Sequence, residues 1–240
     1  MAAGDVIGEA WALYRAHFRH LVTIAFMVFV LIALLTLLLI LLLGGLGALV
    51  AGFISVAGVF WLQGALVIAV DDVKDGRADL SVGQTLERVR PRLNTLSLAA
   101  LAALVALTVA SLLVFFGLLL FILPGLILLA VFVYCLVRWI LVVPVIMLEG
   151  RGVVGALGRS SQLVHGHGWS VFGVILVTLV VLLGVGAGIA AVLAPLPDGI
   201  QGLVGEIVGS TLIAPFAALA WTLVYFRLRG ATEPAIAATT

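Results

Sequence analysis

The feature that most constrains the fold is an uncharged run of fifty residues, 21–70. A helix that crosses a bilayer with a hydrocarbon core ~30 Å thick needs about 20 residues, so this run is too long for one crossing. The sequence GGLG at 44–47 offers a turn, because clustered glycines break helices. The run therefore predicts two membrane helices that fold back on each other.

Composition supports a membrane protein. The chain is 65% hydrophobic and 10% charged, with a mean hydropathy of +1.38. A soluble domain is about half apolar and about a quarter charged, so lipid must be the solvent for much of this surface. The apolar stretch 21–43 is too long for the core of a signal peptide. Cys135 is the single cysteine, so an internal disulfide is excluded.

A second uncharged run, 93–137, has its expected turn at Pro124-Gly125, and two more apolar stretches follow on either side of APLPDG at 194–199. We expect an all-α, polytopic membrane protein with six transmembrane helices arranged as three hairpins. The helices are expected near residues 21–43, 49–70, 96–121, 126–148, 169–194 and 207–227. Residues 1–230 would form a single integral membrane domain, and residues 231–240 a short flexible tail.

The basic residues predict the orientation. All 12 Lys and Arg residues except Arg138 fall on one face of the six-helix arrangement, and the opposite turns carry none. Loops rich in Lys and Arg stay in the cytoplasm, so both termini should be cytoplasmic. Abundant alanine, valine, leucine and glycine with little lysine fit a GC-rich bacterium. We therefore expect a bacterial inner-membrane protein.

Three similar segments precede the helices that run outward. They read IGEAWALYRAHFRHL from Ile7, VGQTLERVRPRLNTL from Val82 and VGALGRSSQLVHGHGW from Val154. The expected apolar faces are Ile7, Trp11, Tyr14 and Phe18 in the first segment, and Val82, Leu86, Val89 and Leu93 in the second. We expect interfacial amphipathic helices with their cations toward lipid headgroups. The pattern implies a threefold repeat about the membrane normal, and chance similarity among short amphipathic segments is the alternative.

Arg138 is the most informative single residue. It lies within the fourth expected helix, 11 positions before Glu149, and therefore about 16 Å from that end. A charge at that depth is costly and suggests a functional role, with Tyr134 as a candidate partner. In the alternative interpretation, the side chain extends to the cytoplasmic face or bonds to carbonyls of a neighbouring helix.

Glu149 ends the fourth expected helix. It could pair with Arg151, with Arg159 or with an amine of a lipid headgroup, and we favour a paired structural role because no second carboxylate lies nearby in sequence. Arg159 and Ser160 could anchor their helix to lipid phosphate or cap a neighbouring helix end. A further candidate group for headgroup binding is Arg88, Arg90 and Arg92.

The sequence gives little indication of catalysis. The four histidines, His17, His20, His165 and His167, match no zinc spacing. GVGAG at 184–188 resembles a fragment of a phosphate loop but lies inside the fifth expected helix, where close packing of small residues explains it better. We therefore expect no catalytic residue, no cofactor and no metal.

Several motifs resemble the membrane domain of glycerophosphoryl diester phosphodiesterases and of related uncharacterised six-helix bacterial membrane proteins. The matching pieces are ILPG at 122–125, VVPVIMLEG at 142–150, GALGRSSQLVHGHGW at 155–169 and LVYFRLRG at 223–230. The individual matches are Ala156, Leu157, Arg159, Ser160 and Leu163 in the amphipathic helix, and Tyr225, Arg227 and Arg229 in the closing motif. An acidic residue that is frequent in the closing motif is missing here. The resemblance covers nearly the whole chain.

In the enzymes of that family, a soluble catalytic domain with histidine and acidic residues around a divalent cation follows the membrane domain. This chain ends at Thr240, shortly beyond its last expected helix. We therefore expect a membrane domain without the catalytic domain and without enzymatic activity.

Three functions are compatible with these patterns. The first is a non-catalytic protein that organises lipid or a protein partner through its basic cytoplasmic face. The alternative is a transporter or lipid-handling protein with an anion-attracting cavity lined by Gln63, Tyr134 and Arg138. An intramembrane enzyme that uses Glu149 and the histidines is the third. The expected partners are membrane lipids, with a protein partner or a homo-oligomer possible, and no nucleic acid.

Overall fold

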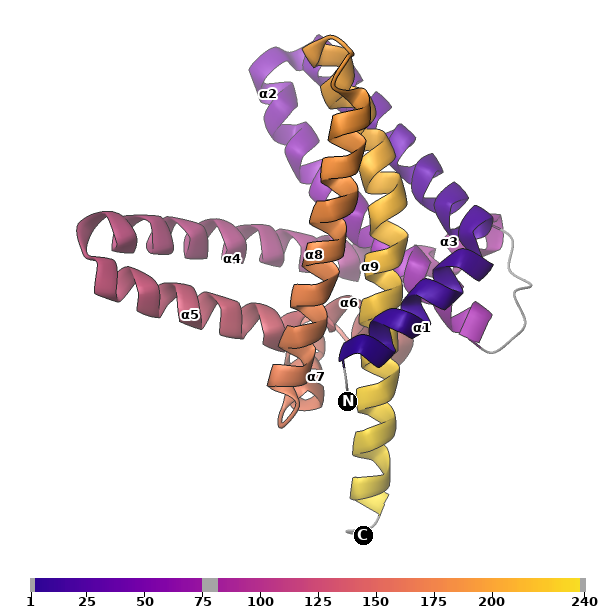
Figure 1. Cartoon of the computed structure of the whole chain (residues 1–240), viewed down its shortest axis with the longest axis vertical. Helices are drawn as coiled ribbons and strands as arrows, with labels where there is room; N and C mark the ends of the chain where they lie inside the picture. Colours follow the sequence, from indigo (N-terminus) through magenta and orange to yellow (C-terminus); the bar gives the residue numbers. More distant parts are fainter. Residues whose placement is uncertain (1–2, 75–81, 238–240) are drawn as a thin grey trace.

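The computed structural model describes residues 3–74 and 82–237, and the chain is helical throughout these ranges apart from short turns (Figure 1). The helices are α1 Ala3–Ala16, α2 Phe18–Lys74, α3 Val82–Val89, the 3₁₀ helix η1 Arg90–Arg92, α4 Leu93–Leu120, α5 Ile122–Trp139, α6 Val142–Glu149, α7 Val153–Val164, α8 Gly168–Leu193 and α9 Asp198–Ala237. Within the described residues, five helical segments are long and apolar enough to cross a membrane: Phe18–Lys74, Val82–Leu120, Ile122–Glu149, Gly168–Leu193 and Val204–Ala231. The all-α, multi-pass character expected from the sequence is confirmed.

Helix α2 folds back on itself at the glycine cluster. Gly44 has φ 57° and ψ −128°, outside the helical region, and glycine adopts positive φ without a Cβ penalty. The two arms, 18–43 and 45–74, lie side by side, with Thr36 Oγ1 and Ser55 Oγ 3.5 Å apart. The turn that the glycines predict is therefore present, and each arm exceeds the length that one crossing needs.

The turn between α4 and α5 lies at Phe121 and not at Pro124-Gly125. Phe121 is extended, with φ −150° and ψ 117°. Pro124 lies in the first turn of α5, where a helix needs no N–H from it. Gly125 instead allows α4 to approach, since a Cβ there would lie 2.5 Å from the amide nitrogen of Leu118.

The helix expected at 126–148 is interrupted. Helix α5 ends at Trp139 and α6 begins at Val142, with a turn between them. Pro144 explains the break, because a continuous helix would lose the hydrogen bond to the Ile140 carbonyl and clash with it. All residues from 141 to 147 are buried, so α6 is enclosed by protein, in contact with α2, α7 and α9.

The core lies where the paired helices meet. Most buried side chains of these helices fall within residues 21–25 and 57–73 of α2, 96–100 of α4, 171–178 of α8 and 216–228 of α9. Toward the tips the side chains are exposed, with Leu41 at 74% and Leu123 at 75%. Figure 1 shows α4 and α5 extending to the left, while α2, α8 and α9 extend upward. We call the region where α1, α3, α6 and α7 join these helices the packed end.

The three segments expected at the interface are helical, and in the first two the side chains that the protein buries coincide only in part with the expected apolar face. The buried side chains are Val6, Ala10 and Tyr14 in α1, and Thr85 and Val89 in α3. Trp11, Phe18 and Leu86 are 47%, 41% and 41% exposed. Helix α1 packs against α8 and α9, so contact with protein decides which of its faces is buried.

The expected tail at 231–240 is also partly helical. Helix α9 continues to Ala237, and residues 238–240 lie outside the described part.

We predict that Gly44→Ala lowers the free energy of unfolding by about 1–2 kcal/mol, because a Cβ is strained at positive φ. Gly45→Ala is the matched control. Gly45 is helical, with open space where its Cβ would lie, so this change should be neutral or slightly stabilising. Unfolding of the purified protein in mixed micelles with increasing SDS measures both. Equal stability of the two variants would contradict the prediction.

Candidate functional site

The break between α5 and α6 is closed by a side chain of α7. Ser160 is fully buried, and its hydroxyl donates to the Arg138 carbonyl at 2.7 Å. The same oxygen accepts from the Leu141 amide at 3.3 Å. Both backbone groups flank the interruption, where the intrahelical bonding pattern is broken. From the sequence, Ser160 was considered either as an anchor to lipid phosphate or as a cap of a neighbouring helix end. Its contacts are those of a helix-end cap.

Arg138 bonds to the end of a neighbouring helix. Its Nε–H donates to the Tyr134 hydroxyl at 2.9 Å, and Nη1–H donates to the Ser161 carbonyl at 3.0 Å. Nη2 lies 3.5 Å from His165 Nδ1. Ser161 is in the last turn of α7, whose carbonyls carry partial negative charge, so a cation is favourable there. The carbonyl contact considered from the sequence is therefore present.

The single helix on which the depth expected for Arg138 was based is interrupted. The estimate of about 16 Å assumed one helix from Arg138 to Glu149, but α5 ends at Trp139. Arg138 thus occupies the last turn of α5, next to His165 at the end of α7 and close to the start of α8.

Arg138 lies at a groove of ≈ 650 Å³ between α5 and the junction of α7 with α8, which we call the Arg138 groove. It is lined by Leu126, Leu129, Ala130, Val133, Tyr134, Val137, Arg138, Val164, His165, Gly166, Gly168, Trp169 and Phe172. Most of these residues are apolar and none is acidic. The alternative function, a transporter or lipid-handling protein, required a cavity lined by Gln63, Tyr134 and Arg138. Tyr134 and Arg138 line the groove, whereas Gln63 does not.

Glu149 is held by residues from α7, α9 and the α6–α7 connection. Its carboxylate accepts from Arg151 Nε at 2.8 Å, from Arg159 Nε at 3.1 and 3.2 Å, and from the Tyr225 hydroxyl at 3.2 Å. The side chains of Glu149 and Arg159 are only 13% and 15% exposed, whereas that of Arg151 is 48% exposed. Gly150, with φ 68°, ends α6 and turns the chain toward Arg151. The pairings considered for Glu149 with both arginines are therefore present.

Polar contacts also attach α1 to α9. Arg227 Nη2 donates to the Asp5 carbonyl at 3.2 Å and to the Glu9 carboxylate. The Tyr14 hydroxyl donates to the Leu212 carbonyl at 3.0 Å. Burial raises the pKa of the Tyr14 hydroxyl, which therefore keeps its proton and its donor role.

The three arginines considered for headgroup binding have different surroundings. Arg88 and Arg90 are exposed. Arg92 is partly buried, and its Nη2 lies 3.2 Å from the position that a Cβ on Gly150 would occupy. Arg88 and Arg90 are thus accessible from outside, while Arg92 packs over the end of α6.

The histidines do not assemble into a metal centre in the part of the chain that the structure describes. No group of three or more His, Cys, Asp or Glu side chains there could hold a metal ion. His165 faces Arg138, and His167 Nδ1 lies 3.4 Å from the His165 carbonyl oxygen.

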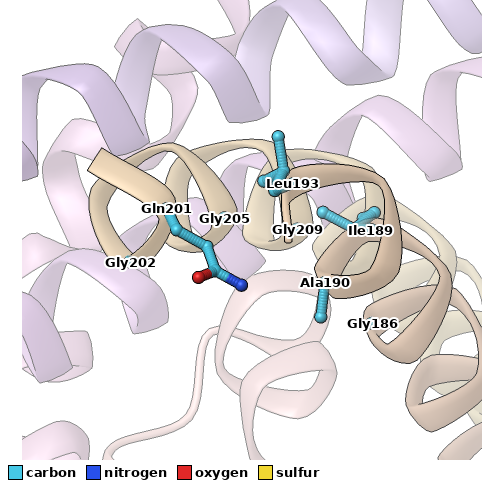
Figure 2. Close-up of a pocket in the computed structure, with 8 residues that line it drawn as sticks. All are labelled: Gly186, Ile189, Ala190, Leu193, Gln201, Gly202, Gly205 and Gly209. Atoms are coloured by element: carbon cyan, nitrogen blue, oxygen red, sulfur yellow. The ribbon is translucent and has the colours of Figure 1, made fainter. Parts of the chain in front are cut away.

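A second hollow, of ≈ 380 Å³, lies between the tips of α8 and α9. Figure 2 shows Gln201 of α9 on one side and Ile189 and Ala190 of α8 on the other. A Cβ on Gly184, Gly186 or Gly188 would meet nothing within 4 Å. The close packing expected from GVGAG at 184–188 is therefore not made with any part of the chain that the structure describes.

Residues 114–227 match the family model described as the membrane domain of glycerophosphoryl diester phosphodiesterase. The match confirms the family resemblance over the stretch from the end of α4 into α9, which includes Arg138, Glu149, Arg159 and Ser160. It is shorter than the resemblance found in the sequence, and Arg88, Arg90 and Arg92 lie outside it. No curated protein and no solved structure matches the chain.

Two contacts of the site were not expected from the sequence. One is the bond from Tyr225 to Glu149, which joins residues far apart in the chain, and the other is the proximity of His165 to Arg138. Pro144 was an available signal for the second, because a break before it places Arg138 at the end of α5. For the bond from Tyr225 to Glu149, the sequence offered no signal other than the closing motif that contains Tyr225.

We predict that Ser160→Ala lowers the free energy of unfolding by about 1–3 kcal/mol, because the Arg138 carbonyl and the Leu141 amide lose their partner. Ser161→Ala is the matched control, since Ser161 contributes its backbone carbonyl to Arg138. Thermal unfolding in detergent measures both variants. A Ser160→Ala protein as stable as Ser161→Ala would show that Ser160 does not stabilise the break.

Proposed function

We propose that this protein is a non-catalytic integral membrane protein that organises anionic lipid at its packed end. The observation that carries the proposal is the pair of exposed arginines, Arg88 and Arg90, at the junction of α3 and η1. Anionic headgroups attract such cations by about 1 kcal/mol each. A structural role for Glu149 supports the absence of catalysis, since arginines and a tyrosine hydroxyl occupy its carboxylate.

The proposal includes a topology of six crossings in three hairpins, with both termini on the cytoplasmic side of a bacterial inner membrane. The two arms of α2 are each long enough to cross, which adds a crossing to the five candidate segments. Exposed tryptophans at helix ends of the packed end, Trp139 and Trp169, suit a membrane–water interface. The Lys and Arg residues near these ends support a cytoplasmic position for this side.

The topology predicts opposite labelling of two introduced cysteines in a Cys135→Ser background. Ala194→Cys, at the end of α8, should react with a membrane-impermeant thiol reagent in intact cells. Gly158→Cys, exposed on α7, should react only after the membrane is opened. Labelling of both cysteines in intact cells would overturn the proposed orientation.

The lipid role predicts that Arg88→Gln/Arg90→Gln reduces co-purified anionic phospholipid several-fold, at about 1 kcal/mol per arginine. The matched control is Arg88→Lys/Arg90→Lys, which keeps both charges. The measurement is the ratio of anionic to zwitterionic phospholipid in polymer-bounded discs cut directly from the membrane. An unchanged ratio in the glutamine variant would count against the proposed function.

A second candidate function is lipid handling at an anion-attracting cavity, which the Arg138 groove favours. The groove combines one cation with largely apolar walls. Such walls suit a lipid better than a hydrated solute, whose path needs several polar groups.

A further inference from the structure

We propose that the Arg138 groove binds one anionic glycerophospholipid, with its phosphate at Arg138 and an acyl chain along α5. The assignment rests on the proposed function, because it requires the protein to lie in a bilayer that contains anionic lipid. It adds a defined site, a binding mode and a ligand class to the general attraction by Arg88 and Arg90.

The walls of the groove suit an acyl chain. Leu126, Leu129 and Val133 follow one another along α5 toward Arg138. From residue 126 to residue 138 the helix rises by about 18 Å. One leaflet of the hydrocarbon core is about 15 Å thick. The groove therefore has the length of one leaflet, with its cation at one end.

The polar end of the groove suits a phosphate. A guanidinium has five N–H donors, and the hydrogen bonds of Arg138 within the described residues use three at most. The groove also contains Gly168 and Trp169, the first residues of α8, where no side chain caps the helix. The first amides of a helix lack intrahelical partners and carry partial positive charge. Remaining guanidinium donors and the start of α8 thus share this end of the groove.

The charges of the groove favour an anionic over a zwitterionic headgroup. Arg138 forms no ion pair within the described residues, and no lining residue is acidic. The phosphate of either headgroup would neutralise Arg138, but the amine of a zwitterionic headgroup would find no carboxylate in the groove. Trp169, 87% exposed at the start of α8, fits the headgroup level of a bilayer.

The test is a titration of the purified full chain in detergent with phosphatidylglycerol, followed by native mass spectrometry of the one-lipid complex. Arg138→Gln should weaken this complex about tenfold, because a charged hydrogen-bond donor is lost. Arg151→Gln is the matched control, since Arg151 is an exposed cation outside the groove. It should bind phosphatidylglycerol as the wild type does.

A second variant tests the groove without removing its charge. Ala130 is exposed and lines the groove, so Ala130→Trp would fill the acyl-chain path without overpacking the core. It should also weaken the complex about tenfold, because the acyl chain loses its buried apolar contacts. Ala106→Trp, at an exposed position of α4 outside the groove, should have no effect. Wild-type binding by Ala130→Trp would overturn the proposal.

Two competitors identify the ligand. Phosphatidylcholine and inorganic phosphate, each at the concentration of phosphatidylglycerol, should not displace it. Displacement by inorganic phosphate would show that the site recognises free phosphate, and displacement by phosphatidylcholine would exclude selectivity for anionic lipid. The Arg88→Gln/Arg90→Gln variant should keep the one-lipid complex, because both arginines lie outside the groove. A loss of anionic lipid from this variant in the disc experiment would therefore report on the proposed function and not on the groove.

Discussion

The arrangement of the site depends on the need to satisfy the backbone where α5 stops and α6 begins. Pro144 prevents one continuous helix, and the buried hydroxyl of Ser160 bonds to both sides of the resulting gap. Since Ser160 belongs to α7, the same two bonds fix α7 against the break. The next residue, Ser161, then presents its carbonyl to Arg138. One buried serine thus couples the path of the backbone to the position of the cation.

A second set of interactions joins the elements on the other side of α6. The carboxylate of Glu149 brings together α6, α7 and α9 through Arg159 and Tyr225. A partly buried charge is costly unless it is paired, so these partners keep the three elements together. The hydrogen-bond partners of Glu149 and Ser160 among the described residues all lie at the packed end, whereas the apolar side chains of the tips are largely exposed. The polar interactions that fix the fold are therefore concentrated at the packed end.

Much of the fold follows from the sequence, because uncharged runs and glycine clusters have direct structural meaning. The glycine cluster predicted the turn at Gly44, and Arg159 was among the partners considered for Glu149. The buried face of α1 was not, because large apolar side chains such as Trp11 can face lipid while smaller ones such as Ala10 face protein. Hydrophobicity does not distinguish these two surroundings. A cavity at Tyr134 and Arg138 was considered from the sequence, but its other walls were not, since they depend on how α5 lies against α7 and α8.

The divergence of the paired helices has a consequence for the surrounding bilayer. In the topology that we propose, the packed end would lie at one membrane surface and the separated tips would extend toward the other, with acyl chains between them. The molecule would then present a wedge to the lipid around it. A wedge is accommodated with less distortion in a membrane that bends in the matching direction, so the proposed topology implies that local curvature would change how well the bilayer accommodates this protein.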